Sequence, residues 1–171
     1  MYYLSLMLRI SIPLIISVNL ISKFFYPLTI YPPYYLLKIM NYQVFIIPPY
    51  IITLENYIRF SEACAAISAY FLLLLLIILT KDIKVKTGIK IFIAGSAIIY
   101  IVNMARIFLL IAILEKYGFS AFQQTHDILW IIFGSLLVAL TWISLSRYYK
   151  IRTIPIYSDV KYLLKQTKLF K

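Results

Sequence analysis

The chain has 171 residues, of which 63% are hydrophobic and 13% are charged, and its formal net charge is +11 at pH 7. This apolar fraction exceeds that of ordinary soluble domains and predicts a single integral membrane domain over residues 1–171. One cysteine excludes an intramolecular disulfide, a CxxC redox pair and a Cys-rich metal site, and one histidine argues against a His-based zinc site. We therefore expect neither a metal nor a cofactor.

Four apolar segments approach the roughly 20 residues that a helix needs to cross a bilayer. In chain order they cover about residues 6–25, 63–80, 91–114 and 127–146. They predict an all-α membrane protein with about four transmembrane helices. Arg9 and Pro13 interrupt the first segment. Because that segment lacks a small-residue cleavage site, we interpret it as an uncleaved first span.

The segment between the first two spans, about residues 26–62, is long and rich in tyrosine and proline. We expect a short interfacial helix over residues 34–40, and short strands in QVFII and YIITL separated by Pro48-Pro49. Tyrosine suits the headgroup level of a bilayer. The segment is therefore predicted to be a long loop on the outer side of the membrane.

The basic residues concentrate in the loop 81–90 and in the tail 147–171. The positive-inside rule places both segments and both termini in the cytoplasm, and the segments 26–62 and 115–125 outside. Twelve cations and two acids then lie inside, against four cations and four acids outside. The positive charge thus reflects topology and attraction to anionic lipid headgroups. We expect no nucleic-acid partner, since no basic stripe interleaves with aromatics on a soluble domain.

Three chemically reactive side chains from three spans fall at one predicted depth. Cys64 lies about 25 Å and Arg106 about 24 Å of helix away from the basic loop, at a rise of 1.5 Å per residue. His126 lies about 31 Å from the start of the basic tail by the same rise. All three are therefore near the outer edge of a hydrocarbon core about 30 Å thick, and one site could hold them.

These residue types support acyl transfer by a cysteine. Ser61 can cap the following helix and so place Cys64 near its third position, where the helix N-terminus and a nearby arginine favour the thiolate. His126 could deprotonate the thiol and then protonate a leaving amine. Arg106 could alternatively bind a developing oxyanion or a substrate carboxylate. We do not expect Asp127 to orient the imidazole, because neighbours in sequence do not share a helix face.

Each of the three residues also has a purely structural interpretation. Cys64 could be a small packed hydrophobe, His126 an interfacial residue, and Arg106 a cation that snorkels to the interface. Asn103 lies three residues before Arg106 on the same helix face. This pair forms a polar stripe on an apolar helix and favours a groove that faces protein.

EACAAI at 62–67, NMARI at 103–107 and the histidine at 126 before an apolar helix resemble the motifs of the exosortase/archaeosortase family. Members carry a cysteine just inside one span, N-x-x-R in the next, and a histidine or arginine opening the following one. The order and the span placement match, and the resemblance covers about residues 30–146. Members commonly read Cys-Ser-Gly where this chain has Ala65 and Ala66 after the cysteine.

The resemblance implies a membrane cysteine protease of the transpeptidase type, with Cys64, Arg106 and His126 as its three catalytic residues. Asn103 and Glu62 match further motif positions, and Ser61 would support the site as the cap. The substrates would be secreted proteins with a C-terminal motif, a hydrophobic helix and a basic tail. Cleavage at the outer face would form a thioacyl-enzyme, from which a lipid amine would accept the protein for the cell surface.

Two alternatives belong to other classes of function. A non-enzymatic four-helix membrane scaffold, or a subunit of a larger complex, would explain the spans and the charge asymmetry without a catalytic site. A transporter subunit would use Arg106 as an anion site.

Overall fold

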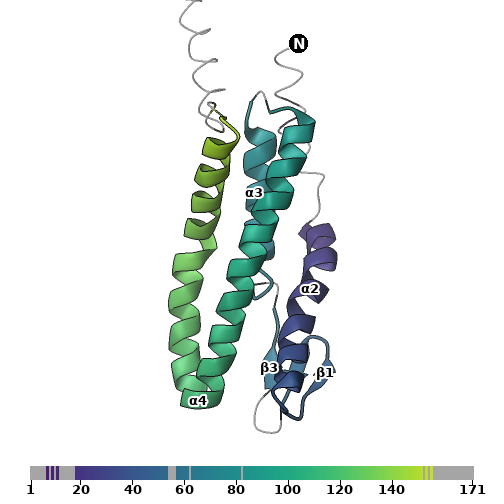
Figure 1. Ribbon diagram of the computed structural model, residues 1–171, viewed down its shortest axis with the longest axis vertical. Coiled ribbons are helices and arrows are strands. Elements are labelled where there is room, and N and C mark those ends of the chain that lie inside the picture. Colours follow the sequence, from purple (N-terminus) through teal and green to yellow (C-terminus); the bar gives the residue numbers. More distant parts are fainter. Residues whose placement is uncertain are drawn as a thin grey trace, which may run out of the picture.

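Figure 1 shows the computed structural model, an elongated bundle of helices with a small β-sheet at one end. It describes residues 7, 9, 11, 18–53, 57–61, 63–81, 83–151, 153 and 155. Much of the predicted first span, Glu62 and the tail beyond residue 155 lie outside the described residues. The helices and strands within them are α2 (Val18–Ile39), β1 (Phe45–Ile47), β2 (Tyr50–Ile52), β3 (Tyr57–Arg59), α3 (Ile67–Leu79) and α4 (Val85–Tyr148).

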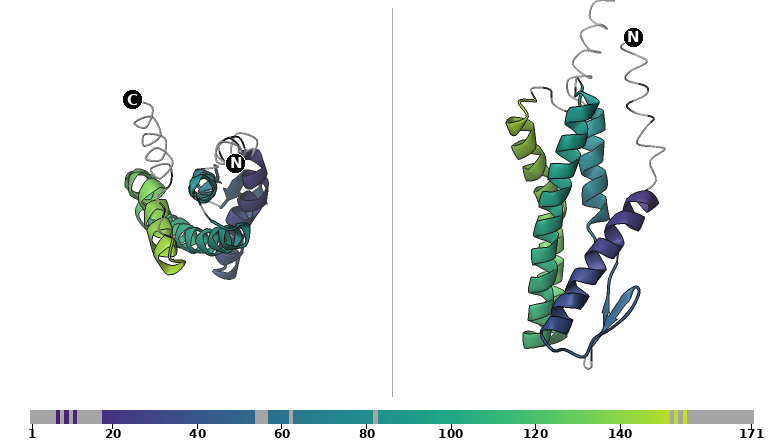
Figure 2. Two further views of the ribbon diagram at one scale, coloured as in Figure 1. Left: turned by 90° about the horizontal axis from the view of Figure 1, so that it is seen from above. Right: turned by 45° about the vertical axis from the view of Figure 1, so that its right-hand side comes forward.

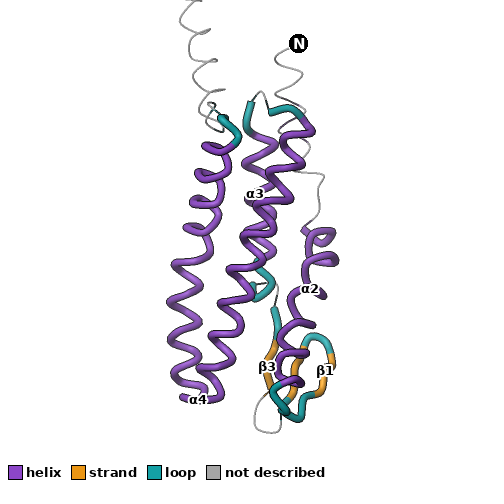
Figure 3. The backbone as a smooth tube through the Cα atoms, in the orientation of Figure 1, coloured by secondary structure: helices purple, strands orange, loops and turns teal. Residues whose placement is uncertain are grey.

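Helix α4 consists of two antiparallel arms joined at a single residue. Gly118 has φ 79° and ψ −178°, a backbone conformation that is open essentially only to glycine. The tube of α4 reverses its direction at the end of the bundle that carries the α4 label in Figure 3. Residues 85–117 form the first arm and residues 119–148 the second. The helices predicted over 91–114 and 127–146 are therefore confirmed. The segment 115–125, which lies between these two predicted spans, is helical except at Gly118.

Helix α3 lies at the centre of the bundle. Seen from above, α2 and the two arms of α4 form a curved row with α3 on its concave side (Figure 2, left). Its sequence, ISAYFLLLLLIIL, is apolar on every face, which suits a helix surrounded by others. The Tyr70 ring stacks on that of Phe25 from α2, with ring centroids 3.7 Å apart. The fully buried side chains of this core include Tyr70, Leu73, Ile91, Ile99 and Val138.

Helix α2 runs through residues 26–39, which the sequence predicted as part of the outward loop. The prediction was wrong there, although the short helix expected over 34–40 falls mostly on its last turns. Three prolines suggested a loop, because a proline inside a helix removes a hydrogen bond. Residue 32 is a proline and has no N–H to donate to the Leu28 carbonyl four residues earlier. In α2 this carbonyl accepts a hydrogen bond from the Tyr100 hydroxyl at 3.0 Å. A side chain of α4 thus satisfies a carbonyl that Pro32 leaves without its helical donor.

The three strands form one antiparallel sheet in the order β1-β2-β3. The strands predicted on either side of Pro48-Pro49 are confirmed as β1 and β2, and that proline pair has a cis peptide bond. Strand β3, which pairs Tyr57 with Ile52, was not predicted. Ile51 of β2 is fully buried and packs with α2 and the first arm of α4. The sheet makes the fold mostly helical instead of all-α, and it leads the chain into the Cys64 segment.

Within the part of the chain that the structure describes, one helical segment, Val85–Leu129, is long and apolar enough to cross a membrane. Helix α3 is apolar but has 13 residues, fewer than the roughly 20 of a typical span. The coarser prediction of a mostly helical fold is therefore confirmed.

Candidate functional site

Cys64 lies in a short turn between β3 and α3. The Ser61 side-chain oxygen accepts the Cys64 N–H at 3.4 Å, and its hydroxyl points to the Cys64 sulfur at 3.5 Å. Ser61 therefore caps this turn and not α3, which the sequence predicted it to cap, since the N-cap residue of α3 is Ala66. The turn does not continue into α3, because Ala66 has φ 53° and ψ 32° in the left-handed region. Cys64 thus stands before the helix, and its expected place on the third position of that helix was wrong.

Two polar side chains of the first α4 arm hold the Cys64 turn. The Asn103 amide donates to the Cys64 carbonyl at 2.8 Å, and Arg106 Nη2 lies 3.4 Å from the carbonyls of both Ala63 and Cys64. Asn103 is 3% exposed and Arg106 7%. Both side chains therefore face protein, as their shared helix face predicted, and Arg106 does not snorkel outward. Its Nε is buried and has no hydrogen-bond partner among the described residues.

Cys64, Arg106 and His126 line one cavity of about 220 Å³. They come from the turn before α3, the first arm of α4 and the second arm, so the fold gathers residues that are far apart in the sequence. The thiol is free and partly buried. The apolar part of the wall consists of Ile58, Phe60, Ile107, Leu110, Ile111 and Phe122.

Two residues of the second arm contact the His126 ring, one at its face and one at its Nδ1 atom. The ring stacks on Phe122 with ring centroids 5.8 Å apart, and its Nδ1 lies 3.3 Å from Asp127 Oδ1. Gln123 Nε2 donates to both oxygens of the same carboxylate, at 3.1 and 3.2 Å. An ionised carboxylate can only accept, so in the neutral imidazole this contact favours the tautomer with the hydrogen on Nδ1 and the lone pair on Nε2. His126 is thereby set up to accept a proton at Nε2.

The expectation that Asp127 would not orient the imidazole was therefore wrong. Successive helix residues point in different directions, but Nδ1 is close to the backbone and a short Asp side chain can reach it. His126 also does not open its helix, because the second arm begins directly after Gly118. Gln123 and Asp127 are four residues apart on one helix, a spacing that allows a side-chain hydrogen bond. This spacing was the sequence signal that could have identified Asp127 as a fixed carboxylate beside His126.

Arg59 of β3 is a further cation on the same cavity. From the sequence, Arg59 was included only in the charge of the outer side. It was not predicted as a cavity residue, because β3 was not predicted and no sequence spacing links Arg59 to Cys64. With Arg106, it gives the cavity two guanidinium groups. Such groups bind carboxylates and developing oxyanions through planar pairs of donors.

The chain that enters the Cys64 turn is fixed by α2 and by the hairpin. The Tyr26 hydroxyl donates to the Phe60 carbonyl at 3.0 Å, and the Phe60 N–H donates to the Pro49 carbonyl at 2.8 Å. Phe60 itself is buried. Together with Asn103, these bonds hold the thiol from both ends of its turn.

The site therefore combines a thiol, an imidazole with a free ring nitrogen, and guanidinium groups in one small cavity. These are the components of nucleophilic acyl transfer: a nucleophile, a base and an anion-stabilising group. Among the described residues, no group of three or more His, Cys, Asp or Glu side chains could hold a metal ion. No protein-family model, curated protein or solved structure matches the chain.

Proposed function

We propose that the chain is a membrane-embedded cysteine protease of the transpeptidase type. It acts on secreted proteins that carry a C-terminal motif, a hydrophobic helix and a basic tail, and it transfers them to an amine of a lipid. The observation that carries this proposal is that Cys64, Arg106 and His126, from three separate elements, line a single cavity. Asn103 and Ser61 support them by holding the Cys64 turn.

The reaction follows from the roles of the three side chains. The Cys64 sulfur attacks the scissile carbonyl carbon, and its proton passes to His126 Nε2. Arg106 stabilises the negative charge that develops on the carbonyl oxygen. The C–N bond then breaks, His126 returns the proton to the leaving amine, and a thioester remains on Cys64. The acceptor amine attacks the thioester, gives a proton to His126 and regenerates the thiol as the new amide forms.

The outer surface of the bundle supports a membrane location. Soluble monomers rarely expose large contiguous apolar areas. Large apolar side chains are exposed along α2 and both arms of α4, namely Leu20, Phe24, Ile93, Ile101, Leu109, Leu136 and Leu140. Helix α3 is short for a span, but it lies on the concave side of α2 and the α4 arms, and the Cys64 turn precedes it on the side of the sheet.

The two ends of the bundle differ in charge as a membrane protein requires. The lysine loop between α3 and α4 lies at one end, and the sheet and the Gly118 reversal lie at the other (Figure 1). With the lysines in the cytoplasm, the Cys64 cavity is nearer the outer face. A secreted protein anchored by its hydrophobic helix would then present its C-terminal motif at the level of Cys64.

A non-enzymatic membrane scaffold is the second candidate, and one observation favours it. The donors of Asn103 and Arg106 are directed at backbone carbonyls of the Cys64 turn, as in a buried polar cluster that only holds the fold together. In that case Cys64 is a packed thiol, and its removal changes no activity.

Co-expression with secreted proteins that carry such a C-terminal signal distinguishes the two candidates. The readout is the shift in mass when the tail is cleaved, measured for wild type, Cys64→Ala and Ser68→Ala. Ser68 is exposed on α3 and does not line the cavity, so its variant is the matched control. The proposal expects no processing by Cys64→Ala and normal processing by Ser68→Ala. Normal processing by Cys64→Ala at equal protein level would leave the scaffold as the better account.

A further inference from the structure

Strand β3 lies at one edge of the sheet, and the chain runs from it directly into the Cys64 turn. The order β1-β2-β3 gives β3 one partner strand, β2, and leaves its other edge without a partner strand. Ile58, Arg59, Phe60 and Ser61 line the Cys64 cavity, whereas no described residue of β1 or β2 does. Strand β3 is therefore the part of the sheet that borders the cavity of the thiol.

The register of the sheet determines which backbone groups of β3 point away from β2. The Phe60 N–H donates to the Pro49 carbonyl at 2.8 Å, so this pair occupies a hydrogen-bonded position of the ladder. Bonded and non-bonded pairs alternate along antiparallel strands, so Ile58 is bonded to its partner Ile51. Arg59 lies between the two bonded positions and directs its N–H and C=O to the unpaired edge. It therefore presents one donor and one acceptor to a further strand.

The residues at both ends of β3, Tyr57 and Arg59, are exposed. An edge strand with outward N–H and C=O groups is a template for pairing with another chain. A strand added there would lie about 4.8 Å from β3, with its side chains alternating between two faces. The α4 wall of the cavity includes the apolar side chains of Leu110, Ile111 and Phe122. The cavity thus offers main-chain partners on one wall and an apolar surface on another.

We infer that the substrate binds as a further strand on the unpaired edge of β3, with one of its residues paired to the N–H and C=O of Arg59 and its scissile bond beside Cys64. The inference rests on the proposed function, because it concerns the substrate of the same cavity. Strand pairing recognises the main chain, so the segment around the scissile bond must be extended. A helical segment would not bind, since its own N–H and C=O groups are bonded within the helix. The substrates are therefore proteins in which an extended linker, and not the hydrophobic helix itself, contains the scissile bond.

Alkylation of Cys64, the only thiol of the chain, tests this edge without a known substrate. The reagents are two tetraalanine peptides with uncharged ends, which carry an iodoacetyl group at the N-terminus or, through ethylenediamine, at the C-terminus. The thiol sulfur displaces iodide, and the two peptides extend from Cys64 in the two possible directions. The measured quantity is the rate of modification in detergent at pH 7, followed by intact mass and divided by the rate with iodoacetamide. This ratio cancels changes in the reactivity of the thiol itself.

One main-chain hydrogen bond contributes a factor of about five, and the pair at Arg59 makes two. One of the two peptides should therefore react with wild type at least about tenfold faster than iodoacetamide does. The same peptide with N-methylalanine at every position cannot donate, so its advantage should fall below about threefold.

Two variants at one position separate the main chain from the side chain. Arg59→Ala retains the N–H, and the uncharged peptides do not need the guanidinium, so the wild-type ratio should remain. Arg59→Pro has no N–H and places its ring on the unpaired edge, so the ratio should fall below about threefold. Proline is tolerated at an edge position that does not donate to the partner strand, so the sheet should still form.

Three results would overturn the inference: no advantage for either peptide, an equal advantage for the N-methylated peptide, or a full advantage in Arg59→Pro. The N-methylated peptide is tested on wild type, so the inference can be contradicted even where Arg59→Pro does not fold.

Failure of this inference and failure of the proposed function are distinguishable. Processing that depends on Cys64, without a faster reaction of either peptide, would contradict only the added strand. A peptide advantage in a chain whose processing does not depend on Cys64 would support peptide binding at the edge and contradict the catalysis.

Discussion

The two ends of α3 carry two different kinds of polar site. Near Cys64, polar side chains are buried and bonded to specific carbonyls: Asn103 and Arg106 are 3% and 7% exposed, and both reach the same turn. At the opposite end, Lys81 is half-buried and Lys84 is exposed, on a connection between helices. The first site depends on the shape of each side chain, whereas the second depends on the number of cations.

This difference follows from the elements that carry the residues. A buried guanidinium on a helix cannot move without breaking the packing around it, so its donors have a fixed direction. A lysine on a connection keeps its flexible stem and can follow a headgroup. The Cys64 end is therefore suited to positioning reacting atoms, and the lysine end carries charge without a fixed geometry.

The strongest test of this difference changes the shape of a side chain at the Cys64 end and keeps its charge. Arg106→Lys keeps the cation but loses the planar fork of donors, so processing should fall by about 10²–10³, as for the loss of one oxyanion donor. Protein level and membrane fraction should stay near normal. Processing rates and immunoblots measure both.

A double variant checks that Arg106 and Cys64 act as one unit. Cys64→Ala/Arg106→Lys should be no worse than Cys64→Ala alone, because residues of one catalytic unit are non-additive. Degradation of Arg106→Lys together with full activity of Cys64→Ala would instead assign Arg106 to holding the bundle.

A smaller loss is expected when the His126 ring loses its orienting partner. Asp127→Asn weakens the contact with Nδ1 and lets the ring adopt the other tautomer, so processing should fall by about tenfold, a modest loss because the Asp127 side chain is exposed. Gln123→Ala removes the bonds to the carboxylate but leaves the charge, and it should cost less than Asp127→Asn. Full activity in both variants would mean that Asp127 is a surface carboxylate that does not orient the His126 ring.

The reversal that brings His126 back to Cys64 can be tested as a backbone effect. Gly118→Ala meets no atom within 4 Å, so any cost comes from φ 79° alone and should be about 1–3 kcal/mol of unfolding free energy. Gly134 also has open space around it but has no positive φ, so Gly134→Ala should stabilise the second arm by up to about 1 kcal/mol. Thermal unfolding in detergent measures both, and equal shifts would contradict a strained reversal.

A still smaller effect is expected at Ala66. Its left-handed φ of 53° costs an L-residue about 1–2 kcal/mol, which glycine avoids in exchange for about 0.5–1 kcal/mol of chain entropy. Ala66→Gly should therefore stabilise the fold by less than about 1 kcal/mol, whereas Ala65→Gly in the same buried turn should destabilise it. Thermal unfolding with the same sign for both variants would contradict this account of the turn.

The smallest change is expected at the lysine end. Lys84→Arg keeps the charge at an exposed position that does not line the Cys64 cavity, so processing should change by less than about twofold. The same exchange of arginine and lysine that should nearly abolish processing at position 106 should thus be silent at position 84. A tenfold loss at Lys84→Arg would show that this end, too, depends on side-chain shape.

Much of the helical frame could be predicted because its signals are local. Apolar runs predicted the helices of α3 and α4, and prolines with β-branched residues predicted β1 and β2. The common depth of Cys64, Arg106 and His126 followed from counting helical rise from the basic segments. These inferences need only neighbouring residues and one length scale.

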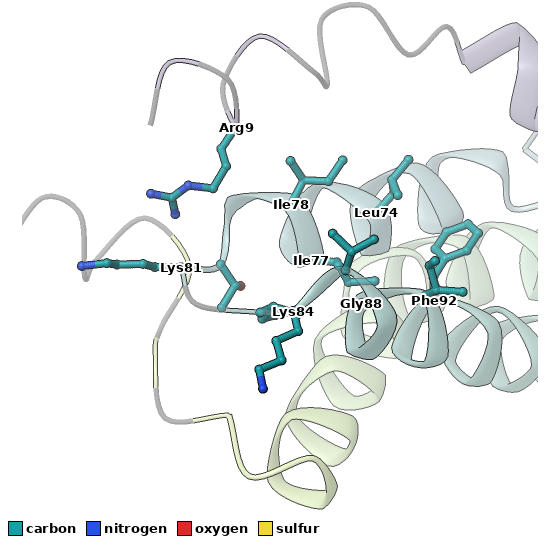
Figure 4. Close-up of a pocket in the computed structure, with 12 residues that line it drawn as sticks. Arg9, Leu74, Ile77, Ile78, Lys81, Lys84, Gly88 and Phe92 are labelled. Carbon is teal, nitrogen blue, oxygen red and sulfur yellow. The ribbon is translucent and has the colours of Figure 1, made fainter. Parts of the chain in front are cut away.

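The remainder depends on contacts between residues far apart in the sequence. Helix α2 continues through its prolines with the help of Tyr100, which is 72 residues away from the Leu28 carbonyl it bonds. Strand β3 forms because it pairs with the edge of β2. No alternation of apolar and polar residues predicted it as a strand. The chain reversal at Gly118 was not predicted, because this single residue connects two helical arms without a longer loop between them. Arg9 lines the same cavity as Lys81 and Lys84 (Figure 4), a proximity that sequence spacing cannot show.

The rate at which iodoacetamide alkylates Cys64 tests the central claim most directly, because it requires no substrate. The only cysteine of the chain gives a single reaction, followed by intact mass in detergent at pH 7. If His126 takes the thiol proton and Arg106 stabilises the anion, wild type should react at least about tenfold faster than His126→Gln and Arg106→Lys. Ser68→Ala should react like wild type. Equal rates in all four proteins would contradict the claim and leave Cys64 a packed thiol.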